Sequence, residues 1–363
     1  MDIERRIELI TREPIEEVVT LEELRQLLET KEHPVAYNGF EPSGLVHLGT
    51  GLLCAYKMRD LVEAGVKVKV LLATYHAWIN NKLGGDLENI RLAAKHFIHA
   101  WVACGVPADK VEFIMADELY DDLDYWTKVL QVARELTITR ARRTLEIAGR
   151  KEFEAKKVVD LIYTPMQVAD IFHMRVDLCQ LGMDQRKANM VAREVGPKLG
   201  YWKPVSLHHH LLLGLAPPPV WPLDKDKMQV ALSDVKMSKS LPETCIFIYD
   251  SPEDIRKKIR KAFCPERETS YNPILEIAKY IVFRERDCLQ VARSKKLGGG
   301  TLELHSYREL EEAYCRGEIH PLDLKNAVAE VLIEILEPVR RYFETNSEAK
   351  QSLEAVQRLQ VTR

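Results

Sequence analysis

Near the amino terminus, a histidine and a glycine stand where a strand gives way to a helix. His47 and Gly49 follow an apolar run at residues 34–37 and open a helix-like stretch over residues 48–64. The start of a helix presents free backbone N–H groups and a partial positive charge, which suit a triphosphate. His47 can donate a hydrogen bond to a phosphate oxygen there, and Gly49 lets a flat base lie against the helix. A single His-x-Gly is more often structural, so a second motif has to support this interpretation.

Two lysines that can bind a pyrophosphate lie in the polar segment 224–244. Lys236, Ser238 and Lys239 belong to the pentapeptide Lys-Met-Ser-Lys-Ser at residues 236–240. Lysines on a flexible loop can close over a pyrophosphate and neutralise the charge that grows as the α–β phosphate bond breaks. The alternative is a solvated basic loop. The order of the two motifs, with the lysines placed after the α/β region, favours nucleotide chemistry.

Three polar residues share one face of an apolar helix predicted over residues 158–174. Tyr163, Gln167 and Asp170 are spaced four and three apart, which places them within a sector of about 60°. Unpaired polar groups are costly in a dry core, so the pattern predicts either a solvated face or contact with a polar ligand. Asp184 and Gln185 follow the next strand-like run, at the carboxyl edge where doubly wound folds bind ligands.

These residues have to be positioned by elements that alternate along the first two-thirds of the chain. The strand-like runs are residues 34–37, 66–73, 111–116 and 176–179, and the helix-like stretches are residues 48–64, 87–103, 125–148 and 185–199. This alternation predicts βαβ units on a parallel sheet. Helix starts predominate from Pro252 onward, at Pro273, Tyr307 and Pro321. We therefore expect an α/β domain, a connection over residues 217–244 and a mainly helical domain.

Composition limits the class of protein. The 363 residues are 46% hydrophobic and 29% charged, with a net charge of −3, which suits two globular domains. No apolar run approaches the roughly 20 residues of a membrane span, and the first residues lack a secretory signal core. Seven scattered cysteines without a Cys-x-x-Cys pair argue against a zinc site and favour the cytoplasm. Consecutive His208, His209 and His210 would point to opposite faces of a strand, so we expect no metal site there.

The His-x-Gly and Lys-Met-Ser-Lys-Ser pair resembles the signature motifs of class I aminoacyl-tRNA synthetases. Residues 37–44, 163–170, 182–187 and 321–328 resemble more specifically the archaeal and eukaryotic-type tyrosyl-tRNA synthetases. The matches run from about residue 30 to residue 340. The resemblance implies an α/β fold, a Rossmann-like doubly wound parallel sheet over residues 1–235 with a helical connective insertion at about 118–180. A pyrophosphate-binding loop and a mainly helical anticodon-binding domain would follow over residues 236–363.

The resemblance also implies a reaction and the residues that carry it. The expected enzyme activates L-tyrosine with ATP, accompanied by Mg²⁺, and transfers the tyrosyl group to the 3′ end of tRNA(Tyr), without a protein-bound metal or organic cofactor. The expected catalytic residues are His47, Lys236 and Lys239. The expected tyrosine-binding residues are Tyr37, His76, Tyr163, Gln167, Asp170 and Gln185. The expected ATP-binding residues are Gly39, His47, Gly49, Thr50, Asp184, Lys236, Ser238 and Lys239.

By the same resemblance the partners are tRNA and a second copy of the chain. Arg143 and Arg186 are expected at the acceptor stem, and His320 and Asp323 at the anticodon. Relatives place an aromatic side chain against the anticodon base, where this chain has Leu297. Base stacking is worth roughly 1–3 kcal/mol, so anticodon discrimination is expected to be weaker or to use another residue. The family is homodimeric through the connective insertion, so we expect a homodimer.

Three other hypotheses stay open at this stage. A tRNA-binding paralogue without catalysis fits Thr50, which stands where the first motif usually has a second histidine and which carries no charge. The complete lysine loop speaks against it. A tryptophanyl enzyme would share the fold, but Tyr37 with Asp170 favours a phenol as the substrate group. A ligase-type nucleotidyltransferase would share the two motifs but leaves the helical carboxyl-terminal region unexplained.

Overall fold

The computed structural model describes residues 1–144, 157–218, 221, 236–239, 241–295 and 298–361. Ser240, Leu297 and the expected domain boundary at residue 235 lie outside these residues. The described chain forms two compact units, which are considered separately. The first comprises residues 1–44, 56–210 and 351–363, and the second comprises residues 45–55 and 211–350.

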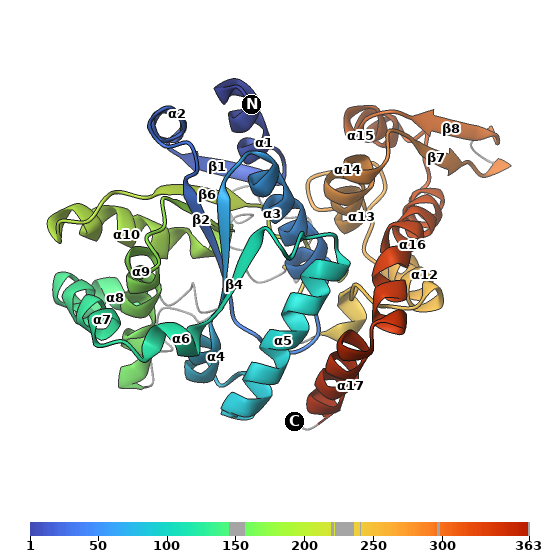
Figure 1. The fold of residues 1–363 in the computed structure, drawn as a ribbon. Coiled ribbons are helices and arrows are strands. Elements are labelled where there is room, and N and C mark those ends of the chain that lie inside the picture. The colour runs from blue at the N-terminus through green and yellow to red at the C-terminus, as the bar shows by residue number, and fades with distance from the viewer. Residues whose placement is uncertain (145–156, 219–220, 222–235, 240, 296–297, 362–363) are drawn as a thin grey trace. The chain divides into compact units, whose positions relative to one another are not determined.

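A six-stranded sheet organises the first unit (Figure 1). Its strands are β1 (Ile15–Val19), β2 (Val35–Phe40), β3 (Lys67–Leu72), β4 (Val111–Met115), β5 (Leu178–Gly182) and β6 (Val205–His209), in the spatial order β1-β6-β5-β2-β3-β4. Neighbouring strands are parallel, except that β1 pairs antiparallel with β6. The strand order reverses between β2 and β5. This is the switch point at which doubly wound folds bind ligands, and the expected fold class is confirmed.

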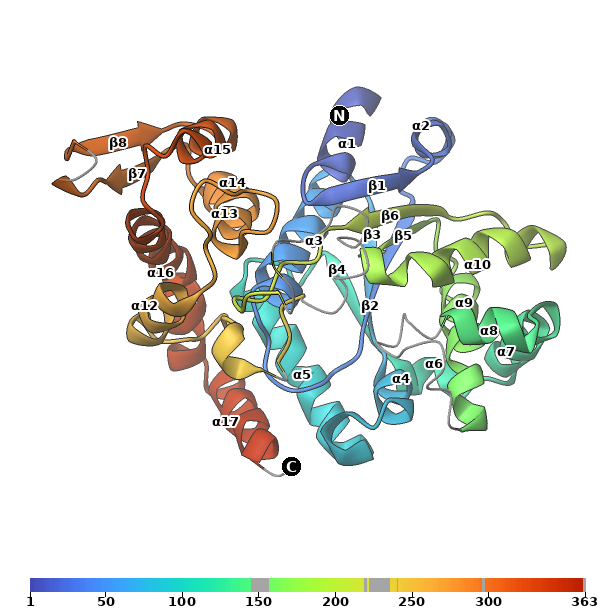
Figure 2. The same cartoon turned by 180° about the vertical axis from the view of Figure 1, so that it is seen from behind.

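Helices cover both faces of this sheet. The two views in Figures 1 and 2 show α3 (Cys54–Glu63) and α5 (Leu87–Ala103) on one face, and α9 (Tyr163–His173) and α10 (Arg186–Lys198) on the other. Every residue of β5 and β6 is buried, as expected for parallel strands that helices cover on both sides. The predicted helix at residues 87–103 is confirmed to the residue.

Other predicted elements of the first unit are corrected by the structure. The stretch predicted as one helix from residue 125 contains two, α7 (Leu123–Glu135) and α8 (Ile138–Thr144), because Leu136 is extended. The helix predicted from residue 158 begins as a 3₁₀ turn, η5 (Val158–Leu161), before α9. The strands β1 and β6 were not predicted. The remaining elements here are α1 (Ile3–Thr11), α2 (Leu21–Thr30), α4 (Thr74–Ile79), η2 (Lys82–Gly85), α6 (Ala116–Tyr120) and η6 (Met183–Gln185).

The second unit is mainly helical. Its helices are η1 (Gly49–Leu53), η8 (Pro242–Thr244), α12 (Pro252–Lys261), α13 (Pro273–Ile277), η9 (Ala278–Val282), α14 (Phe283–Glu285), α15 (Tyr307–Arg316) and α16 (Pro321–Thr345), with the hairpin β7 (Leu289–Ala292) and β8 (Thr301–Leu304). The four predicted helix starts are confirmed. Ser251, Asn272, Ser306 and His320 each accept a backbone N–H hydrogen bond as the N-cap, which satisfies donors that a helix start leaves unpaired. The last helix, α17 (Ser347–Val361), begins in this unit and ends in the first.

Within the described ranges, no helix combines the length and apolar character that a membrane crossing needs. All seven cysteines are thiols, and four of them are buried.

Candidate active site

Tyr37, one of the expected tyrosine-binding residues, lies at the switch point of the first unit. Tyr37 lies on β2 opposite Cys179 of β5 and is only 1% exposed. Its hydroxyl interacts with the side chain of Gln167, and burial raises its pKa well above the usual value. Gly39 lies on the same face two residues on. A Cβ atom at Gly39 would approach Cε2 of Tyr37 to 2.9 Å, so the ring needs a glycine there.

The polar face of α9 points into the protein. Tyr163, Gln167 and Asp170 are 5%, 7% and 1% exposed, so the alternative of a solvated face is wrong. Gln167 donates from Nε2 to Oε1 of Gln185 over 3.1 Å. Its own Oε1 is buried and has no hydrogen-bond partner among the described residues. Because a buried acceptor without a donor is costly, this atom is a candidate contact for a positively charged group of a ligand.

Asp170 is a buried carboxyl group held by two tyrosines. Tyr125 and Tyr120 donate to its Oδ1 over 3.0 and 3.3 Å. Burial raises the pKa of Asp170 to about 7, although both hydrogen bonds oppose the rise. The charge of Asp170 also contributes to the raised pKa of Tyr37, so the two side chains lie close together. A buried acceptor of hydrogen bonds has little competition from water there.

His76, another of the expected tyrosine-binding residues, lies beside Tyr163 and Tyr120. It lies on α4 with its ring edge-on to Tyr163, the centroids 4.6 Å apart. Its Nδ1 is 3.2 Å from the Tyr120 hydroxyl. Burial lowers the pKa of His76 to about 4, so the imidazole is neutral at pH 7.

A carboxylate that the motif analysis left without a role holds Tyr163. The Tyr163 hydroxyl donates to Oε1 of Glu41 over 2.5 Å, and Asn80 donates to the same oxygen over 2.6 Å. Lys82 lies 3.7 Å from the other oxygen. Burial raises the pKa of Glu41 against these contacts.

Three residues of this pocket, Tyr120, Tyr125 and Glu41, were thus missed by sequence reasoning. Tyr120 and Tyr125 precede Asp170 by 50 and 45 residues, and no local spacing links them to it. Glu41 stood inside a recognised motif, Tyr-Asn-Gly-Phe-Glu-Pro, and that position was the available signal.

Asp184, the residue expected to bind the ribose of ATP, lies just past the carboxyl end of β5. Asp184 and Gln185 form η6 directly after the strand. On the neighbouring strands, Asn38 donates to Oε1 of Gln180 over 2.5 Å, and Nε2 of Gln180 lies 2.7 Å from Nδ1 of His209. Burial lowers the pKa of His209 to about 4, while nearby Asp184 acts in the opposite direction.

The second unit joins the His-x-Gly motif to the segment that follows the lysine loop. Leu48 donates its backbone N–H to Ile246, and Ile248 donates to Val46, over 3.0 and 3.1 Å. His47 consequently forms a bridge with Phe247, and Lys236 forms one with Leu213. The two motifs, separated by nearly 190 residues, are therefore built into one compact unit.

His47 is neutral in this setting. It is 8% exposed, and burial, Lys239 and Lys236 lower its pKa to about 3. The backbone N–H of Gly49 donates to its Nδ1 over 3.1 Å. The ring proton is therefore on Nε2, and His47 can act as a neutral hydrogen-bond donor from that atom.

The helix after His47 starts irregularly. Its first turn, η1, is a π-helix, a form found often at functional sites. The Thr50 hydroxyl lies 3.5 Å from the carbonyl oxygen of His47. The lysine motif has no helix or strand at Lys236, Ser238 and Lys239. Within it, the backbone N–H of Met237 donates to the carbonyl oxygen of Leu212 over 2.7 Å.

The expected tRNA contacts are spread over both units. Arg143 is exposed in the last turn of α8, and Arg186 pairs with Glu17 over 2.8 Å. In the second unit, His320 accepts the N–H of Leu322 over 3.1 Å, and Asp323 accepts the N–H of Ser294 over 2.9 Å. These partners order the side chains, and the tRNA roles stay predictions.

The consecutive histidines have separate partners. Nδ1 of His208 lies 2.8 Å from Glu17, Nδ1 of His210 lies 2.6 Å from Glu16, and His209 meets Gln180. Elsewhere, Asp122, Asp124 and His173 lie close enough to ligate one ion. The two carboxylates there are exposed, and Asp124 already pairs with Lys128.

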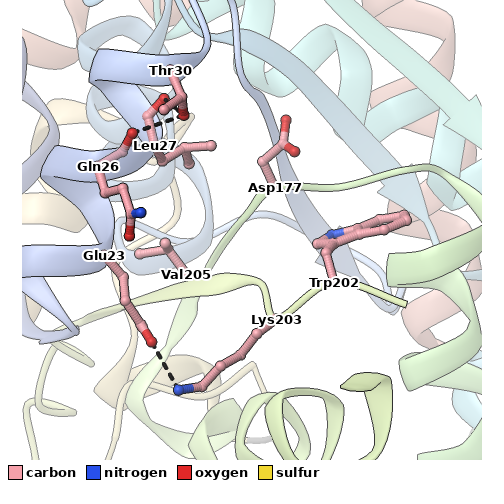
Figure 3. A pocket seen from close by; sticks show the side chains of 8 residues that line it. All are labelled: Glu23, Gln26, Leu27, Thr30, Asp177, Trp202, Lys203 and Val205. Atoms are coloured by element: carbon pink, nitrogen blue, oxygen red, sulfur yellow. Dashed lines mark hydrogen bonds and ion pairs between the residues drawn. The ribbon is translucent and has the colours of Figure 1, made fainter. Parts of the chain in front are cut away.

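A cavity of about 330 Å³ lies at the opposite, amino edge of the sheet. Its lining residues are Glu23, Gln26, Leu27 and Thr30 of α2 with Asp177, Trp202, Lys203 and Val205. Figure 3 shows Lys203 reaching Glu23, a 2.8 Å ion pair, and Asp177 pairs with Lys31 over 2.6 Å. None of the expected site residues lines it. Paired charges at the amino edge fit a structural groove.

Comparison with known proteins assigns the chain to a family. The family model of class I tRNA synthetases (W and Y) matches residues 29–337, and the chain belongs to this family. The Tyrosine--tRNA ligases of Thermococcus kodakarensis and Pyrococcus furiosus are 48% and 46% identical to the chain, with 100% of each chain covered. They place it on the tyrosine branch of the family.

A solved structure of a tyrosyl-tRNA synthetase has the same fold as the chain. The tyrosyl-tRNA synthetase from Pyrococcus horikoshii, complexed with L-tyrosine, has a TM-score of 0.91 and 46% identity over 98% of this chain and 100% of that one. The tryptophanyl-tRNA synthetase from Aeropyrum pernix has a TM-score of 0.66 at 18% identity, which indicates a shared fold alone.

Proposed function

We propose that the protein is a tyrosine--tRNA ligase, which activates L-tyrosine with ATP and transfers the tyrosyl group to tRNA(Tyr). Enzymes of this family use ATP as a substrate, and the full-length relatives carry the activity in their names. The observation in the molecule that carries the proposal is Asp170, a buried carboxyl group next to Tyr37 at the switch point of the sheet.

Selection of tyrosine rests on this carboxyl group. The substrate's phenolic hydroxyl donates to Asp170 and meets Tyr37 on the other side. Phenylalanine would leave the buried acceptor unpaired, which is costly. The α-amino group binds Gln167, Gln185 and Tyr163, and the unpartnered Oε1 of Gln167 supports this assignment.

Activation of tyrosine uses the two motifs. The tyrosine carboxylate attacks the α-phosphorus of ATP, a P–O bond forms, and the P–O bond to the departing pyrophosphate breaks. His47 donates from Nε2 to the phosphoryl centre, and Lys236 and Lys239 neutralise the pyrophosphate, together with the Mg²⁺ that accompanies ATP. Positioning of the reactants supplies the rest of the acceleration.

The remaining ATP contacts are assigned to five other groups. Gly49 and Thr50 bind at the start of the helix, Ser238 binds beside the lysines, Gly39 contacts the nucleotide from β2, and Asp184 binds the ribose. For tRNA, Arg143 and Arg186 meet the acceptor stem, and His320 and Asp323 meet the anticodon.

The proposal includes a homodimer in the cytoplasm. Leu123, Trp126 and Leu130 form an apolar stripe on α7, and they are 82%, 37% and 63% exposed, with Ile138 of α8 at 65%. An exposed apolar patch of this kind fits a protein interface. The thiol state of all seven cysteines fits a reducing compartment.

ATP–pyrophosphate exchange tests the activity. The purified chain should catalyse exchange that depends on L-tyrosine, and phenylalanine or tryptophan at the same concentration should not replace it. Charging of tRNA(Tyr) should follow when the tRNA is added. Exchange driven by tryptophan, or no exchange with any of the three amino acids, would refute the proposal.

A further inference from the structure

Tyr120 occupies a central position in the pocket, and the roles assigned so far do not include it. It ends α6, is 7% exposed, and its hydroxyl reaches two other helices. Oδ1 of Asp170 on α9 is 3.3 Å away, and Nδ1 of His76 on α4 is 3.2 Å away. Its ring stacks on Tyr125 at 4.4 Å and meets Tyr75 edge-on at 5.3 Å. One hydroxyl group therefore links the two buried polar side chains Asp170 and His76.

The atoms that Tyr120 leaves unbonded lie side by side. Oδ1 of Asp170 is filled by Tyr120 and Tyr125, and within the described part of the chain no hydrogen bond reaches Oδ2. Nε2 of His76 is buried and likewise has no partner among the described residues. These two atoms are 3.9 Å apart. A hydroxyl group about 2.8 Å from each of them fits this separation.

We infer that Tyr120 is a positioning residue for the selection of tyrosine, because it holds Asp170 so that Oδ2 accepts the O–H of the substrate's phenol. The inference rests on the proposed function. Tyr120 donates its own proton to Asp170 and accepts from Nδ1 of His76, so the imidazole fixes the Tyr120 hydroxyl in this orientation. The ring of phenylalanine has no hydroxyl to donate and leaves Oδ2 unpaired. Tyr120 acts on the substrate only through Asp170.

The pH dependence of tyrosine capture offers a readout that a merely structural residue would not move. The groups that face Asp170 are Tyr37, His76, Tyr120 and Tyr125, all neutral at pH 7. Burial raises the pKa of Asp170 to about 7, and the two hydroxyl hydrogen bonds oppose this. Without the Tyr120 hydroxyl the pKa rises further. Since the carboxylate is the better acceptor, the acid limb of kcat/KM for tyrosine should move to higher pH.

The experiment compares Tyr120→Phe with Tyr75→Phe in tyrosine-dependent ATP–pyrophosphate exchange from pH 5.5 to 9. Tyr75 packs against the same ring, but its hydroxyl makes no hydrogen bond in the described structure. We expect Tyr120→Phe to raise the KM for tyrosine about tenfold, the effect of losing about 1.4 kcal/mol. The KM for ATP and kcat should stay within about twofold, and the acid limb should shift upward. Tyr75→Phe should match the wild type in all four quantities.

Tyr120→Gln serves as the rescue variant, since its amide can donate to Asp170 and accept from His76. It should return the acid limb toward the wild-type position, and this readout holds even if Tyr120→Phe folds poorly. The inference is overturned if Tyr120→Phe behaves as Tyr75→Phe does, or if Tyr120→Gln and Tyr120→Phe share one pH profile. Absence of tyrosine-dependent exchange in the wild type would instead refute the proposed function.

Discussion

His47 is buried near two lysines, and this explains its charge state. Burial disfavours a protonated imidazole, and repulsion from Lys239 and Lys236 adds to the penalty, so its pKa falls to about 3. At every pH at which the enzyme is expected to work, the residue is a neutral donor from Nε2. The positive charge for the departing pyrophosphate then comes from the lysines, and an uncharged Thr50 removes less from the site than a missing lysine would.

The lysines are therefore the residues to remove. Lys239→Ala should lower kcat for ATP–pyrophosphate exchange by about 100-fold or more, because groups aimed at developing charge supply factors of this size. The KM for tyrosine should stay within about twofold, since other residues bind the amino acid. The control is Lys257→Ala, an exposed lysine on α12, which should keep wild-type exchange. If kcat fell equally in both variants, the effect would come from the loss of any positive charge rather than from the position of Lys239 in the loop.

At the scale of elements, the π-helical turn η1 depends on two glycines that face different neighbours. A Cβ atom at Gly51 would come within 2.8 Å of Ile248 and 2.9 Å of Val46, whereas one at Gly49 would lie 3.1 Å from the ring of His47. The first contact is with the packed core of the second unit. The second is with the side chain of His47, for which a catalytic role is proposed and which can move by a few tenths of an ångström.

The two alanine variants should consequently differ in kind. Gly51→Ala should lower the free energy of unfolding by about 1–3 kcal/mol, the usual effect of overpacking, as measured by urea denaturation. The free energy of unfolding of Gly49→Ala should lie within about 0.5 kcal/mol of the wild-type value. This variant should instead lower kcat for exchange, because the added Cβ displaces His47. Equal stability of Gly51→Ala and the wild type would contradict the packing argument.

At the scale of the whole molecule, the open question is assembly. On α7, Tyr125, Val129 and Val132 are buried on one side, while the apolar stripe of Leu123, Trp126 and Leu130 is exposed on the other. A helix that is apolar on both sides is expected to bury the second side against a partner.

Sedimentation equilibrium tests this. The wild type should have twice the 41.8 kDa mass of one chain, and Leu130→Glu should sediment as a monomer because burying an unpaired carboxylate in an apolar interface is costly. Glu135→Lys changes an exposed charge on another side of α7 and should stay dimeric. A monomeric wild type would remove the dimer from the proposal.

Much of the site could be read from the sequence where local spacing carries the information. The helix period placed Tyr163, Gln167 and Asp170 on one face, and the cap residues placed the helix starts at Pro252, Pro273, Tyr307 and Pro321, because both depend on neighbours a few residues away. The helix predicted over residues 125–148 was wrong in its continuity, since composition alone does not reveal the extended Leu136. The short edge strand β1 carries two acids, Glu16 and Glu17, and escaped detection.

By itself, then, the sequence determined the class of fold and the family resemblance, and it predicted the two motifs that would bind phosphate. Only the tertiary structure decided that α9's polar face is buried rather than solvated, that Tyr120 and Tyr125 hold Asp170, and that His47 is joined to Phe247 in one unit with the lysines. The physical reason is separation along the chain. These contacts join residues from 45 to 200 positions apart, and they form because the sheet and the helices pack, which no local period records.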